Sequence, residues 1–310
     1  MDSWKSNKVL FAILSLPALF WLAVFFLVPL GFVWVLSVGE KQGIIDIAIT
    51  GTVANYVRAV DPLYLSILWD SLWIAGITTV ICLMVGFPIA MAINFAPSRW
   101  KPILLLLIIL PFWTNLLIRT YALIAVLRSQ GYINGFFETI WQAITNTLIA
   151  LGIDPVPMMG PWFEPFDLLY NQGAVIYGLV YVHLPFMVLP LYAALERLDK
   201  SYLEASLDLG AGQWRTLFAI TVPLAMPGII SGVIITFIPA LGTFLTPNLL
   251  GGPDSQMIGN VIENQFKSAN DWPFGAAMSF LLMYVTFGAL ALRAIWSDRA
   301  ARRTGTLATG

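Results

Sequence analysis

Long runs of apolar residues, separated by short polar connections, dominate the pattern along this chain. A bilayer core about 30 Å thick needs about 20 apolar residues in a helix to cross it. Six runs meet that length, and they cover residues 9–36, 71–95, 102–127, 173–195, 228–245 and 274–296. We therefore expect an all-α fold, a polytopic membrane helix bundle with six transmembrane helices, as a single domain over residues 1–310.

The composition supports a membrane protein and excludes several other classes. The 310 residues are 59% hydrophobic and 11% charged, with a mean hydropathy of +0.82, which is outside the usual range of soluble domains. The formal net charge is -1, so nothing in the charge favours nucleic acid as a partner. Cys82 is the only cysteine in the sequence, which excludes an intrachain disulfide and cysteine-based metal sites.

The positions of Lys and Arg between the runs predict the orientation, because cytoplasmic loops carry an excess of these residues. With both termini in the cytoplasm, eleven of the sixteen basic residues lie on the cytoplasmic side. They are Lys5, Lys8, Arg99, Lys101, Arg197, Lys200, Arg215, Arg293, Arg299, Arg302 and Arg303. The polar segment between the fourth and fifth runs, residues 196–227, is then a cytoplasmic loop.

Acidic residues have the opposite distribution. Eleven of them fall on or near the outer face, against four basic residues there, which leaves a surplus of seven negative charges. The acids are Glu40, Asp46, Asp61, Asp70, Glu138, Asp154, Glu164, Asp167, Asp254, Glu263 and Asp271. Such a field favours cationic ligands. The simpler interpretation is that acids fill the outer loops because bases are held inside.

The loop over residues 196–227 predicts a short, separately capped helix. Ser201 is followed three residues later by Glu204, which is the pattern of a capping box, and Gly210 suits the left-handed turn that ends a helix. The expected helix, residues 202–209, is too short to cross a membrane or to be stable alone in water. Pro223 then redirects the chain toward the fifth run. This pattern is compatible with a helix that a partner protein binds and also with an ordinary helix at the membrane interface.

The spacing in this loop resembles the EAA loop of ABC-importer permeases. The residues that carry the resemblance are Glu204, Ala205, Ser206, Gly210, Ile220 and Pro223. In that family the loop forms a coupling helix in a cleft of a cytoplasmic ATPase subunit, which implies an ATPase-coupling role for these residues together with Ser201. Ser206 stands where alanine is usual, and Val222 stands where leucine usually precedes the proline. The spacing itself is intact.

Most of the chain also resembles the spermidine/putrescine permeases of this class. The matching stretches are Leu184–Asp199, Ile238–Gly252, Asp271–Ser279, Ser71–Val80 and Leu110–Ala122. The resemblance implies a type I (MetI-like) importer fold in the bacterial cytoplasmic (inner) membrane. It also implies two protein partners: a second permease subunit, which is a different chain, and an external polyamine-binding protein. It also implies a dimer of cytoplasmic ATPases that bind ATP and Mg, with no cofactor in this chain.

Motifs of catalysis are absent from the sequence. The chain has no G-x-x-x-x-G-K-[ST] phosphate loop and no G-x-S-x-G serine elbow, and its single histidine, His183, excludes an HExxH metal site. We therefore expect a transport subunit that is not an enzyme, with no metal site and with ATP hydrolysis carried out by a partner. His183 either lines a pathway or makes a hydrogen bond between helices.

A flexible polycation would be recognised by carboxylates and by aromatic faces, since each cation–π contact contributes roughly 0.5–2 kcal/mol. Candidates for a substrate pathway are Asp70, Trp113, Asn115, Tyr121, Tyr181, Tyr192 and Thr243. For each of them, helix packing or interfacial anchoring is an alternative role. Asp70 is the strongest of these candidates, because an acidic residue at the end of a span costs energy, and a role in function would explain that cost.

Two further features have simpler interpretations. Arg119 is seventeen residues into the third run, or about 26 Å along a helix, which brings it near the outer interface where its side chain can snorkel into water. Residues 136–148 carry apolar side chains at helical spacing, which predicts an amphipathic helix at the outer interface, either anchoring the chain or docking an external partner.

The sequence thus favours an ATP-dependent polyamine permease, and three alternatives stay open. The first keeps the importer but carries another organic cation, a vitamin or a chelated metal. The second is a secondary transporter or channel that works alone; such transporters usually show internal repeats and ionisable residues at the midplane. The third is a membrane scaffold or assembly subunit that transports nothing.

Overall fold

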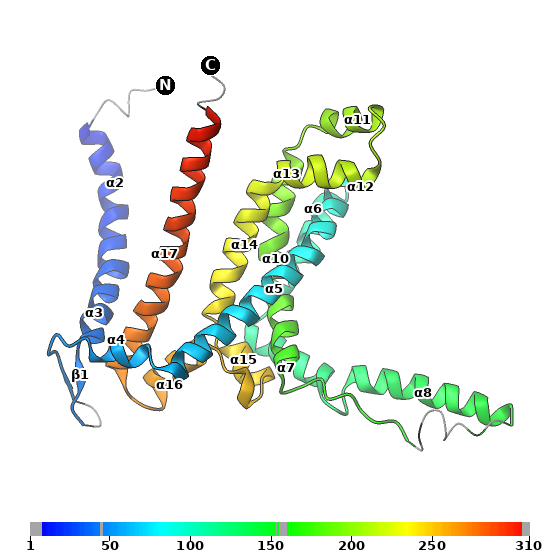
Figure 1. Ribbon diagram of the computed structural model, residues 1–310, viewed down its shortest axis with the longest axis horizontal. Coiled ribbons are helices and arrows are strands. Elements are labelled where there is room, and N and C mark those ends of the chain that lie inside the picture. Colours follow the sequence, from blue (N-terminus) through cyan, green and yellow to red (C-terminus); the bar gives the residue numbers. More distant parts are fainter. Residues whose placement is uncertain (1–7, 44–45, 153, 155–159, 161, 306–310) are drawn as a thin grey trace. The chain divides into compact units, whose positions relative to one another are not determined.

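The N-terminal helices form one long apolar stretch. The computed structural model describes residues 8–43, 46–152, 154, 160 and 162–305. Helix α2 (Lys8–Leu22) continues through a π-helical turn, η1 (Ala23–Leu27), into α3 (Val28–Ser37) (Figure 1). The π turn lies just before Pro29, which has no N–H to complete a regular helical bond. Most of the described apolar side chains here are exposed, as a lipid-facing helix requires.

The described residues divide into two units. The first is drawn from residues before 66 and after 260; in it α17 (Trp272–Gly305) packs on α3 and on α4 (Ala54–Ala59). Two strands of two residues, β1 (Glu40–Lys41) and β2 (Ile47–Ala48), pair antiparallel in this unit. This hairpin of two-residue strands leaves the expected all-α class unchanged, since nearly all other elements of the described residues are helical.

The second unit, residues 66–260, carries most of the helices. Its elements are most of α5 (Pro62–Phe95), α6 (Lys101–Ile109), η2 (Leu110–Trp113), α7 (Leu116–Leu127), α8 (Tyr132–Ala150), α10 (Gln172–Glu196), α11 (Lys200–Asp208), α12 (Gln213–Thr216), η3 (Leu217–Thr221), α13 (Val222–Leu224), α14 (Met226–Leu241), α15 (Leu245–Leu250), η4 (Pro253–Ser255) and the start of α16 (Ile258–Lys267). Its main core joins α5 to α10, with Cys82 and Met187 fully buried.

Helices α10 and α14 lie side by side in this unit because small residues let their backbones approach (Figure 1). A Cβ atom added at Gly228 would collide with the Cβ atom of Ala194, and one added at Gly232 would lie 2.7 Å from the sulfur of Met187. Gly228 and Gly232 form a GxxxG pattern, which in membrane helices allows close packing. This pattern was not part of the sequence prediction.

The predicted spans correspond to long or paired helices. Among the described residues, the stretch Ile13–Ser37, α5 and α10 are long and apolar enough to cross a bilayer. Two bent pairs pass the same test together: Lys101–Trp113 with Leu116–Ala150, and Gln213–Leu224 with Met226–Leu241. The apolar part of α17, Trp272–Gly288, is shorter. Six spans are consistent with this pattern, although α5 begins nine residues before the predicted start at residue 71.

The third predicted span, residues 102–127, is a bent pair of helices and not one continuous helix. The stretch Lys101–Trp113 and the stretch Leu116–Ala150, which comprises α7 and α8, make an angle of 93°, and the break between them lies where η2 gives way to α7. Thr114 is extended, with its hydroxyl bonded to the Pro111 carbonyl, and the Asn115 side chain caps α7 by accepting from the Leu117 N–H at 2.8 Å. Proline followed by an Asn cap ends one helix and starts another.

The expected snorkelling of Arg119 is also wrong, because it assumed a straight helix. Its side chain is 8% exposed, and its guanidinium carbon lies 5.8 Å from the centre of the Phe112 ring. Among the described atoms its Nε has no hydrogen-bond partner.

The amphipathic helix predicted over residues 136–148 is confirmed by α8.

Candidate functional site

The loop between α10 and α14, residues 197–225, is called the α11 loop below. Its helix α11 begins two residues earlier than predicted, because Asp199 and not Ser201 is the N-cap. The Asp199 carboxylate accepts from the Ser201 N–H at 3.0 Å. This backbone hydrogen bond stabilises the charged carboxylate and holds the pKa of Asp199 below its usual range. The prediction that Ser201 caps the helix in a capping box with Glu204 is therefore wrong, because Asp199 is the capping residue.

The C-terminal end of α11 is a complete Schellman motif, as the glycine predicted. Gly210 has φ +80°, its N–H bonds to the Leu207 carbonyl at 2.9 Å, and the Ala211 N–H bonds to the Ser206 carbonyl at 3.1 Å. These two bonds satisfy carbonyls that the end of a helix leaves unpaired. Both ends of α11 are therefore fixed by local bonds, which a helix of 9 residues needs.

A buried hydrogen bond holds α11 to α12. Ser206 Oγ lies 2.9 Å from Thr216 Oγ1, and both side chains are buried. Directly after Thr216 the chain makes a second π-helical turn, η3, and Thr221 places its hydroxyl 3.4 Å from the Thr216 carbonyl. As with Pro29, the π turn lies just before a proline, Pro223. The serine that departs from the usual alanine therefore has a structural role.

A groove of about 630 Å³ runs between α11 and the segment from Ala211 to Leu224. Four residues of the predicted coupling set line it: Ala205, Ser206, Ile220 and Pro223. Gly210 ends the helix beside it, while the exposed Ser201 and Glu204 do not line it. Four of the seven predicted coupling residues, although spread along the loop, therefore line one groove.

The α11 loop also presents large apolar side chains to solvent, which sequence reasoning missed. Leu209 is 89% exposed, Trp214 is 75% exposed, and Tyr202 and Leu207 are exposed as well. Exposed apolar and aromatic residues on a loop between two spans suit contact with a partner protein or with the membrane surface. No local pattern predicts this exposure, because the sequence does not tell which face of so short a helix is covered.

The ends of the loop are attached differently. On the α14 side the chain bends by 67° between Leu224 and Met226. On the α10 side, Tyr192 donates to Glu196 at 2.5 Å, and Lys101 Nζ lies 3.8 Å from the same carboxylate. The last turn of α10 is thus tied to the start of α6, immediately before the loop begins.

The substrate-pathway candidates do not gather in one place. Tyr192 lies in the buried core at the loop end of α10, eleven residues, or about 16 Å, beyond Tyr181. Asn115 caps α7, and Thr243 lies in the connection between α14 and α15. Asp70 is half-buried within α5, while Trp113, Tyr121 and Tyr181 are exposed. The bond from Tyr192 to Glu196 favours a packing role for that tyrosine.

His183 is buried and bonded within its own helix. Its Nδ1 lies 2.9 Å from the Leu179 carbonyl, so the predicted bond between two helices is wrong for this nitrogen. A carbonyl only accepts, so Nδ1 carries the proton. No cluster of His, Cys, Asp and Glu suited to a metal ion occurs within the described part of the chain.

A membrane helix bundle with a capped loop between α10 and α14 is the architecture expected of an importer permease, and the comparisons with known proteins agree with it. The family described as binding-protein-dependent transport system inner membrane component matches residues 83–302. The chain belongs to this family. Its fold is that of ABC-importer permeases: it superposes on a chain of a bacterial alginate ABC transporter, crystallised with an alginate-bound periplasmic protein, with a TM-score of 0.69 at 18% identity, over 97% of this chain and 98% of that one.

Curated relatives are closer in sequence. The spermidine/putrescine transport system permease protein PotB of Escherichia coli is 41% identical over 86% of this chain and 90% of its own length. PotB of Haemophilus influenzae is 41% identical over 84% of each chain. These are permease subunits, which agrees with the expectation of a transport subunit that is not an enzyme.

Proposed function

We propose that this chain forms the translocation pathway of an ATP-driven polyamine importer in the bacterial cytoplasmic membrane. The observation that carries the proposal is the 41% identity, over 86% of this chain, to a permease named for spermidine and putrescine. The surplus of outer acidic residues supports a cationic cargo. An external binding protein delivers the polyamine, a second permease subunit completes the pathway, and both termini lie in the cytoplasm.

The α11 loop is the part proposed to receive energy from ATP. Partner ATPase subunits bind ATP and Mg, and α11 sits in a cleft of one of them. The exposed Leu209 and Trp214 supply apolar contact area for that docking. The Asp199 cap and the Gly210 turn fix the two ends of α11, and the Ser206–Thr216 bond attaches α11 to α12. Closure of the ATPases then moves the loop as a unit and switches the bundle from inward-open to outward-open.

Within the bundle, the proposed pathway is lined by Asp70, Trp113, Asn115, Tyr121, Tyr181 and Thr243. The exposed faces of Trp113, Tyr121 and Tyr181 are available for cation–π contacts in the assembled transporter. Asp70 supplies a carboxylate. Tyr192 is the weakest member of the set, because its hydroxyl is already committed to Glu196.

The test is ATP hydrolysis by the complete complex in lipid vesicles, with its binding protein, against spermidine, putrescine, other organic cations and anions. We expect stimulation by polyamines alone. Glu204→Lys, on the exposed surface of α11, is expected to abolish stimulation while assembly persists, and Glu138→Lys on α8 serves as the matched control. Stimulation by another ligand class would overturn the polyamine assignment, and normal coupling in Glu204→Lys would overturn the role of α11.

A further inference from the structure

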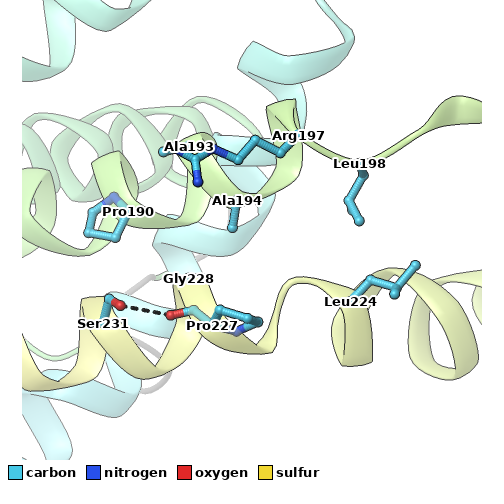
Figure 2. Close-up of a pocket in the computed structure, with 9 residues that line it drawn as sticks. All are labelled: Pro190, Ala193, Ala194, Arg197, Leu198, Leu224, Pro227, Gly228 and Ser231. Carbon is cyan, nitrogen blue, oxygen red and sulfur yellow. Dashed lines mark hydrogen bonds between the residues drawn. The ribbon is translucent and has the colours of Figure 1, made fainter. Parts of the chain in front are cut away.

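A second groove lies where the α11 loop joins the two spans on either side of it. It encloses about 450 Å³ between the end of α10 and the beginning of α14 (Figure 2). Its walls are largely small and apolar, with Ala193 from α10, Leu198 and Leu224 from the loop, and Pro227 from α14. Ser231 contributes a hydroxyl that donates to the Pro227 carbonyl at 2.8 Å.

One cationic side chain, Arg197, also lines this groove. Figure 2 shows the side chain running back along α10 toward Ala193. The two carboxylates nearest in sequence are engaged elsewhere, since Glu196 accepts from Tyr192 and Asp199 accepts from the Ser201 N–H. Within the part of the chain that the structure describes, Arg197 has no ion pair. Its five N–H donors are therefore available to an external acceptor.

We propose that this groove binds the headgroup of an anionic phospholipid from the cytoplasmic leaflet. A guanidinium binds phosphate oxygens through paired hydrogen bonds, and the apolar walls suit the glycerol ester region and the first carbons of the acyl chains. The leaflet on the cytoplasmic side is rich in anionic lipids. The inference rests on the proposed function for its orientation, because that orientation places the α11 loop in the cytoplasm.

The position of the groove gives such a lipid a regulatory role. Leu198 leads from α10 into the loop, and Leu224 is the last residue of α13 before the 67° bend. A lipid in the groove therefore contacts both connections through which α11 is attached to the spans. Binding that favours one geometry of these connections shifts the equilibrium between transporter states by the difference in affinity for them. Anionic lipid is expected to strengthen coupling between polyamine and ATP hydrolysis.

Two readouts on the purified complex test the proposal. The first is the amount of phosphatidylglycerol retained through purification and re-addition, measured by mass spectrometry; the second is spermidine-stimulated ATP hydrolysis in vesicles of phosphatidylethanolamine with and without phosphatidylglycerol. Arg197→Gln removes the charge, and Ala193→Phe fills the groove while keeping Arg197. Arg99→Gln, which removes an exposed charge in the connection between α5 and α6, is the matched control.

We expect Arg197→Gln and Ala193→Phe each to retain at least fivefold less phosphatidylglycerol than wild type and to lose the response of ATP hydrolysis to this lipid, with Arg99→Gln unchanged. Wild-type retention in both groove variants would overturn the lipid site and leave the proposed function standing. Retention that depends on Arg197 in a complex without polyamine-stimulated hydrolysis would support the lipid site and overturn the proposed function.

Discussion

Ser206 Oγ and Thr216 Oγ1 lie 2.9 Å apart in a buried contact that joins α11 to α12. Each hydroxyl is the partner that the other needs, since a buried hydroxyl without a hydrogen bond is costly. The loop that carries the exposed Leu209 and Trp214 is therefore a connected piece. This is the property that a segment passing motion from one subunit to another requires.

Ser206→Ala is expected to loosen the loop, because it leaves Thr216 buried without a partner at a cost of about 1–3 kcal/mol. Hydrogen exchange of the α11 amides should then accelerate by tenfold or more. Thr216→Val should have a similar effect, and the double variant should cost less than the two single costs combined. Additive single effects would show that the two hydroxyls do not act as a pair.

Gly228→Ala is expected to destabilise the packing of α10 on α14, since the new Cβ atom would collide with Ala194 and would lie 2.8 Å from the Pro190 carbonyl oxygen. Overpacking of this kind costs roughly 1–3 kcal/mol. Gly242→Ala is the matched control, because a Cβ atom there would meet nothing closer than 3.9 Å. The check is the thermal midpoint of the purified complex, which should fall for Gly228→Ala alone.

The cap of α11 is expected to depend on pH through Asp199. Its pKa is lowered in the folded chain, so the stability that it contributes is present above the ordinary Asp pKa of about 3.9 and is lost as the pH falls through the lower folded value. Asp199→Asn should retain a cap without this dependence. Amide exchange of α11, corrected for the intrinsic effect of pH and measured from pH 6 downward, distinguishes the wild type from Asp199→Asn. Identical profiles would contradict the assignment.

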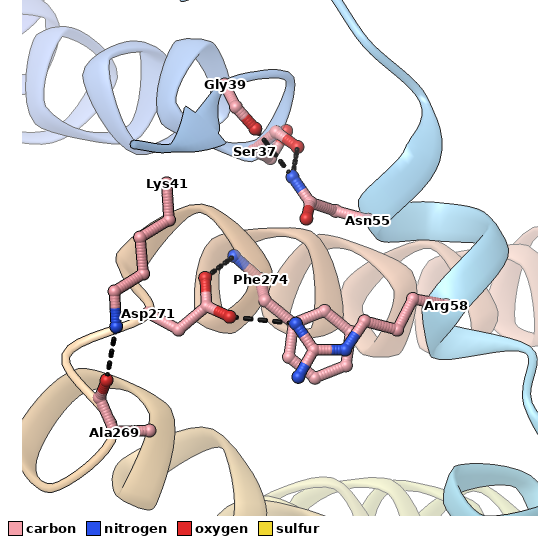
Figure 3. Close-up of polar contacts among 8 residues, drawn as sticks. All are labelled: Ser37, Gly39, Lys41, Asn55, Arg58, Ala269, Asp271 and Phe274. Atoms are coloured by element: carbon pink, nitrogen blue, oxygen red, sulfur yellow. Dashed lines mark hydrogen bonds and ion pairs between the residues drawn. The ribbon is translucent and has the colours of Figure 1, made fainter. Parts of the chain in front are cut away.

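Arg58 is expected to hold α4 against the start of α17. Its guanidinium bonds to Asp271 at 2.8 Å and lies 3.9 Å from the centre of the Phe274 ring (Figure 3). Burial lowers the pKa of Arg58, but the hydrogen bond to Asp271 and neighbouring charges outweigh this and raise it, so the group stays charged. Arg58→Gln should cost about 1 kcal/mol, since the side chain is half exposed.

The check for Arg58 is exchange protection of the α4 amides, which should fall severalfold in Arg58→Gln. Lys267→Gln, which breaks an ion pair within α16, controls for the loss of an outer charge. Equal protection in Arg58→Gln and wild type would contradict the contact.

The spans could be predicted from the sequence because the length of an apolar run is set by the thickness of the bilayer. Breaks within a run are harder to predict, since apolar character continues through them. The break before α7 depends on Pro111 and on the Asn115 cap, a local signal that the length criterion ignores.

The candidate site was predictable in part. The positions of Glu204, Gly210 and Pro223 indicated a short capped helix, and Gly210 has the backbone conformation expected. The choice of cap was wrong because Asp199 and Ser201 are both good N-cap residues, and sequence alone does not rank them. The bond between Ser206 and Thr216, ten residues apart, depends on how α12 folds back on α11. No local pattern encodes that contact.

The most direct test of coupling is a cross-link from α11 to the partner ATPase. Leu209→Cys places a thiol on the most exposed apolar residue of the loop, while the native Cys82 is buried. With a short bifunctional reagent, we predict an efficient cross-link between Leu209→Cys and the ATPase subunit whose yield changes when ATP is bound, and none from Tyr132→Cys on α8. Absence of the Leu209→Cys product in a complex that still hydrolyses ATP would contradict the assignment of α11 as the coupling helix.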